Sequence, residues 1–196
     1  MKYRECWIYL IFMALANIGL LTDSVAANLY YYPDLVFNGE IHRLFTHAFV
    51  HVSWYHLLLD GSAFIMLYNI IEEPSIYKRS LYVLGANISC VIGVTWILPF
   101  YDSIGFCGLS GIDHGLMTIW ALQVIRQKDK AVSRIGQITF ITVLAKALYE
   151  AVSKHVFFDF MHANLMGQPV TISHISGIAG AILLFIILTP LTNSLT

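Results

Sequence analysis

Four side chains from three separate parts of the chain have the types that acid–base and nucleophilic chemistry needs. His56 and Asp60 are four residues apart, so they share one face of a helix. Ser110 lies in the run Gly-Leu-Ser-Gly, and His174 lies much later in the chain. A serine hydroxyl becomes a nucleophile at neutral pH when a base is within hydrogen-bond reach, and a neutral histidine is such a base. Ser110 and His174 are therefore the candidate nucleophile and base.

The residues beside Ser110 suit the stabilisation of negative charge. Glycine at position 108 permits a tight turn and the close approach of a substrate backbone. The start of a helix offers unpaired N–H groups to a developing oxyanion, which makes Gly108 and Leu109 candidate supporting residues. Gly177 and Ala181 form a stripe of small residues, which lets the last helix approach a neighbour closely enough for His174 to reach Ser110.

The segments that must position these side chains are apolar. Hydrophobic residues make up 58% of the 196 residues and charged residues only 12%, against roughly 25% charged residues in a soluble domain. A helix needs about 20 apolar residues to cross a bilayer. The chain is therefore expected to be an all-α membrane protein forming one domain over residues 1–196. The expected spans are 7–21, 52–71, 81–99, 111–125, 138–158 and 172–188.

Charge and cysteine content exclude other classes of protein. Eleven Lys and Arg against 12 Asp and Glu give a net charge of -1, which leaves no basic surplus for binding nucleic acid. The three cysteines, Cys6, Cys90 and Cys107, are odd in number and lack metal-ligand spacing. A disulfide framework or a zinc knuckle is therefore not expected.

The distribution of basic residues predicts the orientation in the membrane. Eight of the eleven lie at three places, namely Lys2 and Arg4, Lys78 and Arg79, and the stretch 126–134. The positive-inside rule puts all three in the cytoplasm, together with both termini. The second, fourth and sixth spans then begin at the outer face, so all four candidate residues lie at a similar shallow depth. The N-terminal segment also has features of a secretory signal, since basic residues precede it and Ser-Val-Ala-Ala follows it at 24–27.

Other polar groups leave alternatives open. Lys146 and Glu150 are four residues apart in the fifth segment, which fits an internal ion pair or, for Glu150, recognition of a polar substrate group. His51 fits either a brace for the outer loop or a further recognition residue. His56 and His174 would also suit the two axial ligands of a haem in a membrane redox protein. Zinc is not expected, because the chain contains no His-Glu-x-x-His motif.

Together these motifs resemble those of the rhomboid intramembrane serine proteases. The resemblance rests on His51-x4-His56-x3-Asp60 in the second segment, Gly108-x-Ser110-Gly111 at the head of the fourth and His174-x2-Gly177 in the sixth. It implies a bundle of six transmembrane helices in which Ser110 is the nucleophile and His174 the base. It also implies that His56 and position 60 bind the oxyanion. The resemblance implies neither a metal nor an organic cofactor.

The run from Gly108 to Gly115, Gly-Leu-Ser-Gly-Ile-Asp-His-Gly, is similar to the rhombosortase branch of that family. This likeness implies a single-span, membrane-anchored protein substrate, cleaved near the outer membrane face at a C-terminal Gly-Gly sorting signal. It also implies the bacterial inner membrane, with the active site toward the periplasm. An inactive rhomboid-like protein that binds membrane helices is the alternative within the family.

Two positions depart from the usual rhomboid pattern. Ala181 stands where a glycine is expected four residues after Gly177, and alanine also permits close packing. Position 60 is Asp rather than Asn. A neutral Asp60 would donate a hydrogen bond as Asn does, whereas an ionised Asp60 accepts only and would instead orient His56. The second role is favoured, because the two side chains lie one helical turn apart.

Overall fold

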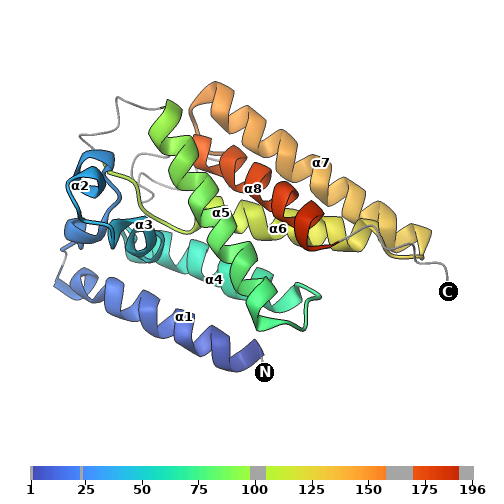
Figure 1. Cartoon of the computed structure of the whole chain (residues 1–196), viewed down its shortest axis with the longest axis horizontal. Coiled ribbons are helices and arrows are strands. Elements are labelled where there is room, and N and C mark those ends of the chain that lie inside the picture. The colour runs from blue at the N-terminus through green and yellow to red at the C-terminus, as the bar shows by residue number, and fades with distance from the viewer. Residues whose placement is uncertain (1, 23, 98–104, 158–169, 190–196) are drawn as a thin grey trace.

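The computed structural model describes residues 2–22, 24–97, 105–157 and 170–189, and within these ranges the elements are helical (Figure 1). The long helices are α1 (Lys2–Ala16), α4 (Trp54–Ile70), α5 (Ile76–Ile97), α6 (Ser110–Ile125), α7 (Lys130–Ser153) and α8 (Ile172–Leu188). The only strand-like pairing in these ranges is an isolated antiparallel bridge between Tyr31 and Phe106. The expectation of an all-α protein is confirmed for the described residues.

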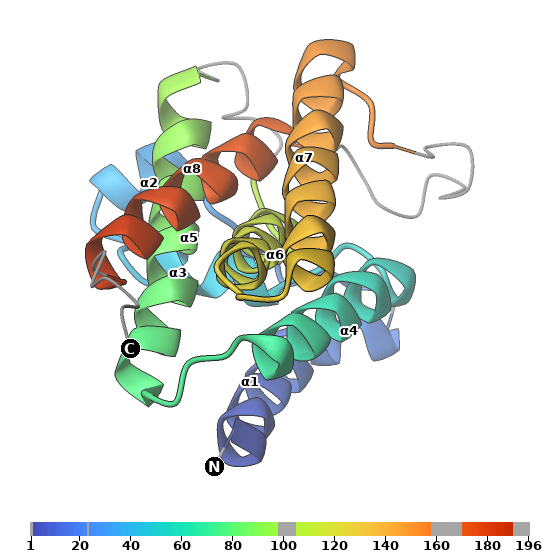
Figure 2. The ribbon, with the colours of Figure 1, turned by 90° about the vertical axis from the view of Figure 1, so that its right-hand side faces the viewer.

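Helix α6 lies in the middle of the bundle. Figure 2 looks almost along its axis and shows α4, α5, α7 and α8 arranged around it, and each of these four helices packs against it. Helix α1 packs on α4, at the side of the molecule away from α7. The start of α6, where Ser110 stands, is therefore surrounded by the helices that can bring other side chains to it.

Helix boundaries differ most from the expected spans in the fifth segment. Helix α7 begins eight residues before position 138, because Asp129 caps it by accepting hydrogen bonds from the N–H groups of Ala131 and Val132. It ends at Ser153, where Lys154 takes a left-handed conformation with φ 60° and donates its N–H to the Glu150 carbonyl. The capping residues determine where a helix begins and ends, whereas hydropathy shows only which part of it is apolar. Position 158 and positions 98–99, where two expected spans end, lie outside the described residues.

Fewer of the described helices are long and apolar enough to cross a membrane than the six spans expected from the sequence. Within the described ranges, two helical stretches are long and apolar enough to cross a membrane, Arg4–Thr22 and Lys130–Ser153. Helix α8, over Ile172–Leu188, is apolar but shorter. Helices α4 and α6 have 17 and 16 residues, fewer than the about 20 apolar residues that a full crossing needs.

The segment between α1 and α4 is built from short helical turns. These are η1 (Ile18–Thr22), η2 (Ala27–Leu29), α2 (Pro33–Phe37), α3 (Arg43–Thr46) and η3 (His47–Phe49). The buried Arg43 ties them together, because its guanidinium donates to the carbonyls of Ala27 and Tyr30 and pairs with Glu40 at 2.7 Å. The bridge between Tyr31 and Phe106 then attaches this segment to the residues that precede α6.

A buried ion pair joins three helices at the other end of the bundle. Arg79 of α5 is 2% exposed and binds Glu5 of α1 through two hydrogen bonds, at 2.6 and 3.1 Å. The Tyr68 hydroxyl of α4 donates to the same carboxylate. Arg79 is one of the basic residues expected in the cytoplasm, and it also neutralises an acidic group inside the protein.

Candidate active site

A glycine turn places Ser110 at the first position of α6. Gly108 has φ 103°, which is favourable only for glycine, and its N–H donates to the His47 carbonyl at 3.0 Å. A Cβ atom at Gly108 would lie only 3.0 Å from His56 Nε2. The tight turn expected before Ser110 is therefore required by the neighbours of Gly108, since His47 lies on one side of the backbone and His56 on the other.

Glycines also set the separation between α6 and α8. A Cβ atom at Gly177 would lie 2.0 Å from the Gly111 carbonyl oxygen, so the two backbones are in direct contact there. Gly180 faces a different neighbour, because a Cβ atom there would lie 2.1 Å from Ser89 Oγ of α5. Ala181 is fully buried. The small residues of α8 therefore serve two interfaces, and the one at Gly177 lies one turn after His174.

Ser110 and His174 are in hydrogen-bond contact. The Ser110 Oγ and His174 Nε2 atoms are 3.0 Å apart. His174 is 5% exposed, while Ser110 is half-buried. This is the geometry that a nucleophilic hydroxyl and its general base require.

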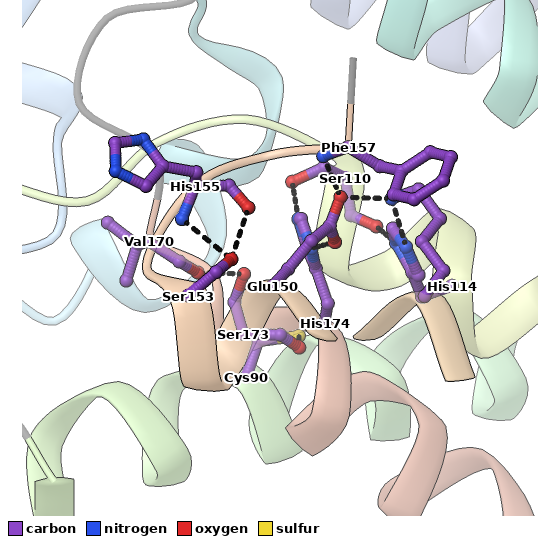
Figure 3. Close-up of polar contacts among 11 residues, drawn as sticks. Cys90, Ser110, His114, Glu150, Ser153, His155, Phe157, Val170, Ser173 and His174 are labelled. Atoms are coloured by element: carbon purple, nitrogen blue, oxygen red, sulfur yellow. Dashed lines mark hydrogen bonds and ion pairs between the residues drawn. The ribbon is translucent and has the colours of Figure 1, made fainter. Parts of the chain in front are cut away.

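Glu150 contacts the opposite side of the same imidazole (Figure 3). Its Oε2 atom is 2.8 Å from His174 Nδ1, and its Oε1 atom accepts hydrogen bonds from Lys146 Nζ and the Phe157 N–H, both at 2.7 Å. The ion pair with Lys146 was one of the two sequence interpretations. The contact with His174 was not expected, and the signal for it in the sequence was that Glu150 lies at about the same expected depth in the membrane as the other candidate residues.

His114 supports the site from α6. Its ring stacks on that of His174, with centroids 4.1 Å apart and planes inclined by 10°. His114 Nδ1 lies 2.7 Å from the Ser110 carbonyl and therefore carries the proton, which leaves Nε2 to accept from Lys146 Nζ at 3.0 Å. Lys146 thus connects His114 to Glu150.

A second polar cluster lies behind the Gly108 turn. Asp60 Oδ2 is 3.1 Å from His56 Nε2 and accepts the Leu109 N–H at 3.1 Å. His51 Nε2 lies 3.7 Å from the same oxygen, and the His51 ring meets His56 edge-on. Burial lowers the pKa of His51, against the raising effect of Asp60. His51 is fully buried and offers no exposed atom to a substrate.

Two groups of side chains among the described residues have the donor types of a metal site. They are His51 with His56 and Asp60, and His114 with Glu150 and His174. In each group the potential ligand atoms lie within 4.8 Å of one another. In the second group the ligand atoms already have hydrogen-bond partners, which is the arrangement of an acid–base network.

The geometry agrees with what is found by comparison with known proteins. No curated protein and no solved structure matches the chain. The rhomboid domain, however, matches residues 38–191, which include both polar clusters and every helix that packs on α6. Rhomboid proteins are integral membrane proteins and include intramembrane serine proteases. Because the match covers most of its length, this chain belongs to the rhomboid family.

Proposed function

We propose that this chain is an active intramembrane serine endopeptidase, with Ser110 as nucleophile and His174 as general base. The hydrogen bond of 3.0 Å between Ser110 Oγ and His174 Nε2 is the observation that carries the proposal. A family member that only bound membrane helices would have no need of this contact. A haem protein would need a free nitrogen on His174, and both of its ring nitrogens are already hydrogen-bonded.

The reaction follows from the positions of these atoms. As Ser110 Oγ bonds to the substrate carbonyl carbon, its proton passes to His174 Nε2 and the carbonyl π electrons move to the oxygen. The tetrahedral intermediate then expels the amine, which takes the proton from His174. A water molecule, deprotonated by the same nitrogen, hydrolyses the acyl-enzyme and restores Ser110.

The negative oxygen of the intermediate requires hydrogen-bond donors. The Ser110 N–H is one candidate, because the first N–H groups of a helix have no acceptor within it. His56 is another through its Nδ1 atom, because its Nε2 already donates to Asp60, and a ring paired with that carboxylate can carry a proton on both nitrogens. Leu109 contributes differently from what was expected, because its N–H already donates to Asp60. Asp60 then acts as an acceptor that orients His56 and the turn.

We further propose that the six long helices all enter the bilayer, with the active site near its outer face. The start of α6, the start of α8 and the last turns of α7 meet at Ser110, His174 and Glu150, so the site lies at one end of the bundle. The basic stretch at 126–134 follows the other end of α6. Under the positive-inside rule that end is cytoplasmic. We place the protein in the bacterial inner membrane with the site toward the periplasm.

The proposed substrate is a membrane-anchored protein with one span and a Gly-Gly sorting signal. This proposal rests on the likeness of Gly108–Gly115 to the rhombosortase branch. The buried surroundings of Ser110 add a physical reason. A scissile bond flanked by glycines has no side chains to fit past α6 and α8, whose backbones touch at Gly111 and Gly177.

The test uses a reporter with a Gly-Gly motif, an apolar helix and a basic tail. Purified protein in detergent should cleave the reporter, and a fluorophosphonate should label Ser110. Ser110→Ala and His174→Ala should each abolish cleavage while the melting temperature stays near that of the parent. Because nucleophile and base act as a unit, the double variant should be scarcely worse than either single variant.

Two results would contradict the proposal. One is cleavage by Ser110→Ala at the parental rate. The other is losses in the two single variants that multiply in the double variant. A reporter whose Gly-Gly is replaced by Leu-Leu tests the proposed substrate signal independently of the proposed protease activity. If this reporter is cleaved as well as the Gly-Gly reporter, the protein is still a protease, but it does not recognise a Gly-Gly signal.

A further inference from the structure

We infer that Glu150 is the third member of a Ser110–His174–Glu150 triad, and that it positions the catalytic histidine. This inference rests on the proposed protease function and adds a positioning residue to it. The sequence motifs alone specify only a serine and a histidine.

The three side chains form a continuous hydrogen-bonded row. Ser110 Oγ and Glu150 Oε2 contact opposite nitrogens of His174, at 3.0 and 2.8 Å. A carboxylate only accepts hydrogen bonds, so His174 Nδ1 must carry a proton for this contact to form. In the neutral ring, Nε2 then has its lone pair directed at the Ser110 hydroxyl. The contact with Glu150 therefore selects the tautomer in which His174 is a base toward Ser110.

Glu150 is itself held by two further donors. Lys146 Nζ and the Phe157 N–H both donate to Oε1, each at 2.7 Å, which leaves Oε2 for His174. Glu150 is 0% exposed, so the orientation of its carboxylate is fixed by these contacts. Lys146 lies one turn earlier on α7 and its side chain is 37% exposed. A buried carboxylate with an ammonium partner remains an anion, as a triad requires.

The charged and titratable groups around His174 fit the same role. His114 covers one face of the ring and, with its own Nε2 accepting from Lys146, is neutral. Lys146 binds Glu150 and His114, both of which contact the His174 ring. When His174 takes the Ser110 proton, its positive charge faces the Glu150 anion. Glu150 keeps its charge throughout, and the proton goes on to the leaving amine from Nε2.

The burial of Glu150 argues against the role in substrate recognition that the sequence also allowed. A recognition residue must present an atom to the substrate. Glu150 is 0% exposed, and its two oxygens are directed to His174, Lys146 and Phe157. A purely structural ion pair with Lys146 would not place the second oxygen on the catalytic base.

Steady-state kinetics with the Gly-Gly reporter provide the first test. Glu150→Gln should lower kcat by roughly 10²–10⁴-fold with KM within about threefold of the parental value, because only the base is misoriented. Glu150→Asp keeps the negative charge but has a side chain shorter by one methylene group. Its kcat should therefore lie between those of Glu150→Gln and the parent. Glu72→Gln is the matched control, since the same substitution at this exposed position, away from the site, should change neither constant.

The second test does not depend on activity. Histidine labelled with ¹⁵N reports which ring nitrogen carries the proton, and the His174 signals are assigned by their loss in His174→Asn. The parent should show the proton on Nδ1 of His174. In Glu150→Gln the amide can also donate, so the proton should shift toward Nε2. If Glu150→Gln does not fold, Glu150→Asp is measured instead. It should have a lower kcat than the parent and should keep the proton on Nδ1 of His174.

The outcomes separate this inference from the proposed function. A rise in KM at unchanged kcat in Glu150→Gln would make Glu150 a recognition residue and overturn the triad. Full activity in that variant, or a tautomer that does not change, would also overturn it. A parent that neither cleaves the reporter nor reacts with a fluorophosphonate would refute the protease function instead. The ¹⁵N experiment would still determine whether Glu150 orients His174.

Discussion

At the scale of single residues, Asp60 is one of the two positions at which this chain differs from the usual rhomboid pattern, and the one beside Ser110. Its Oδ2 atom lies within 3.1 Å of both His56 Nε2 and the Leu109 N–H. Both partners are donors toward it, so Asp60 acts as an acceptor. An asparagine could supply a donor to the oxyanion directly, whereas the role we propose for this aspartate is to hold His56 and the Leu109 N–H.

Substitutions at Asp60 distinguish the two roles. Asp60→Ala should lower kcat about 10²–10³-fold, the range for loss of one oxyanion donor, because His56 and the turn lose their common acceptor. Asp60→Asn should be almost as impaired, because an amide has no charge to hold His56. The measurement is kcat with the Gly-Gly reporter. Near-parental activity in Asp60→Asn would show that the side chain donates as a neutral acid, and full activity in Asp60→Ala would exclude both roles.

Cys107 is a second potential nucleophile, three residues before Ser110, and its raised pKa disfavours it. Burial raises the pKa of the Cys107 thiol to about 12. Since the thiolate is the reactive form of a cysteine, very little of Cys107 is reactive at neutral pH. In a variant that keeps Cys107 as its only cysteine, iodoacetamide at pH 7.5 should leave protease activity unchanged. Alkylation should rise about tenfold per pH unit, and rapid inactivation at pH 7.5 would contradict this.

At the scale of elements, the contact of α6 with α8 determines whether His174 reaches Ser110. Gly177→Ala would place a Cβ atom 2.0 Å from the Gly111 carbonyl oxygen, and a backbone cannot move aside as a side chain can. The two helices must separate. A misplacement of about 1 Å at a reacting pair costs on the order of 10²-fold in rate.

We therefore expect Gly177→Ala to lose at least about 10²-fold in kcat and to melt at a lower temperature. Gly61→Ala in α4 is the matched control, because the nearest atom to its Cβ would be the flexible Met13 side chain at 3.3 Å. Both substitutions raise helix propensity equally. Equal activity in the two variants would show that the close approach of α6 and α8 is not needed for catalysis.

At the scale of the whole molecule, the orientation in the membrane decides which substrates can reach Ser110. Single cysteines are placed in a variant without native cysteines, one between Arg126 and Arg134 and another at 159–171. In intact cells the first should be shielded from an impermeant thiol reagent and the second should react. After the membrane is permeabilised, both should react. The reverse pattern would put the active site at the cytoplasmic face and remove periplasmic substrates from consideration.

Much about this protein follows from the sequence by itself. Low charge and long apolar segments require helices, because backbone groups in hydrocarbon must be hydrogen-bonded within the segment. Helix α8 has the same limits, 172–188, as the expected segment. The spacing of Gly108, Ser110, His174 and Gly177 identified the rhomboid family, to which the domain match assigns the chain. Motifs carry this information because chemistry and close packing each restrict the residue types at a few positions.

Only the tertiary structure decided which polar groups meet. Glu150 is 24 residues from His174 and 40 from Ser110, and their contact depends on how α6, α7 and α8 cross. Asp60 reaches the Leu109 N–H across 49 residues for the same kind of reason. The ends of α7 also depended on capping by Asp129 and Lys154 rather than on hydropathy. Spacing along one helix fixes which residues share a face, but the partner of that face is set by packing between helices.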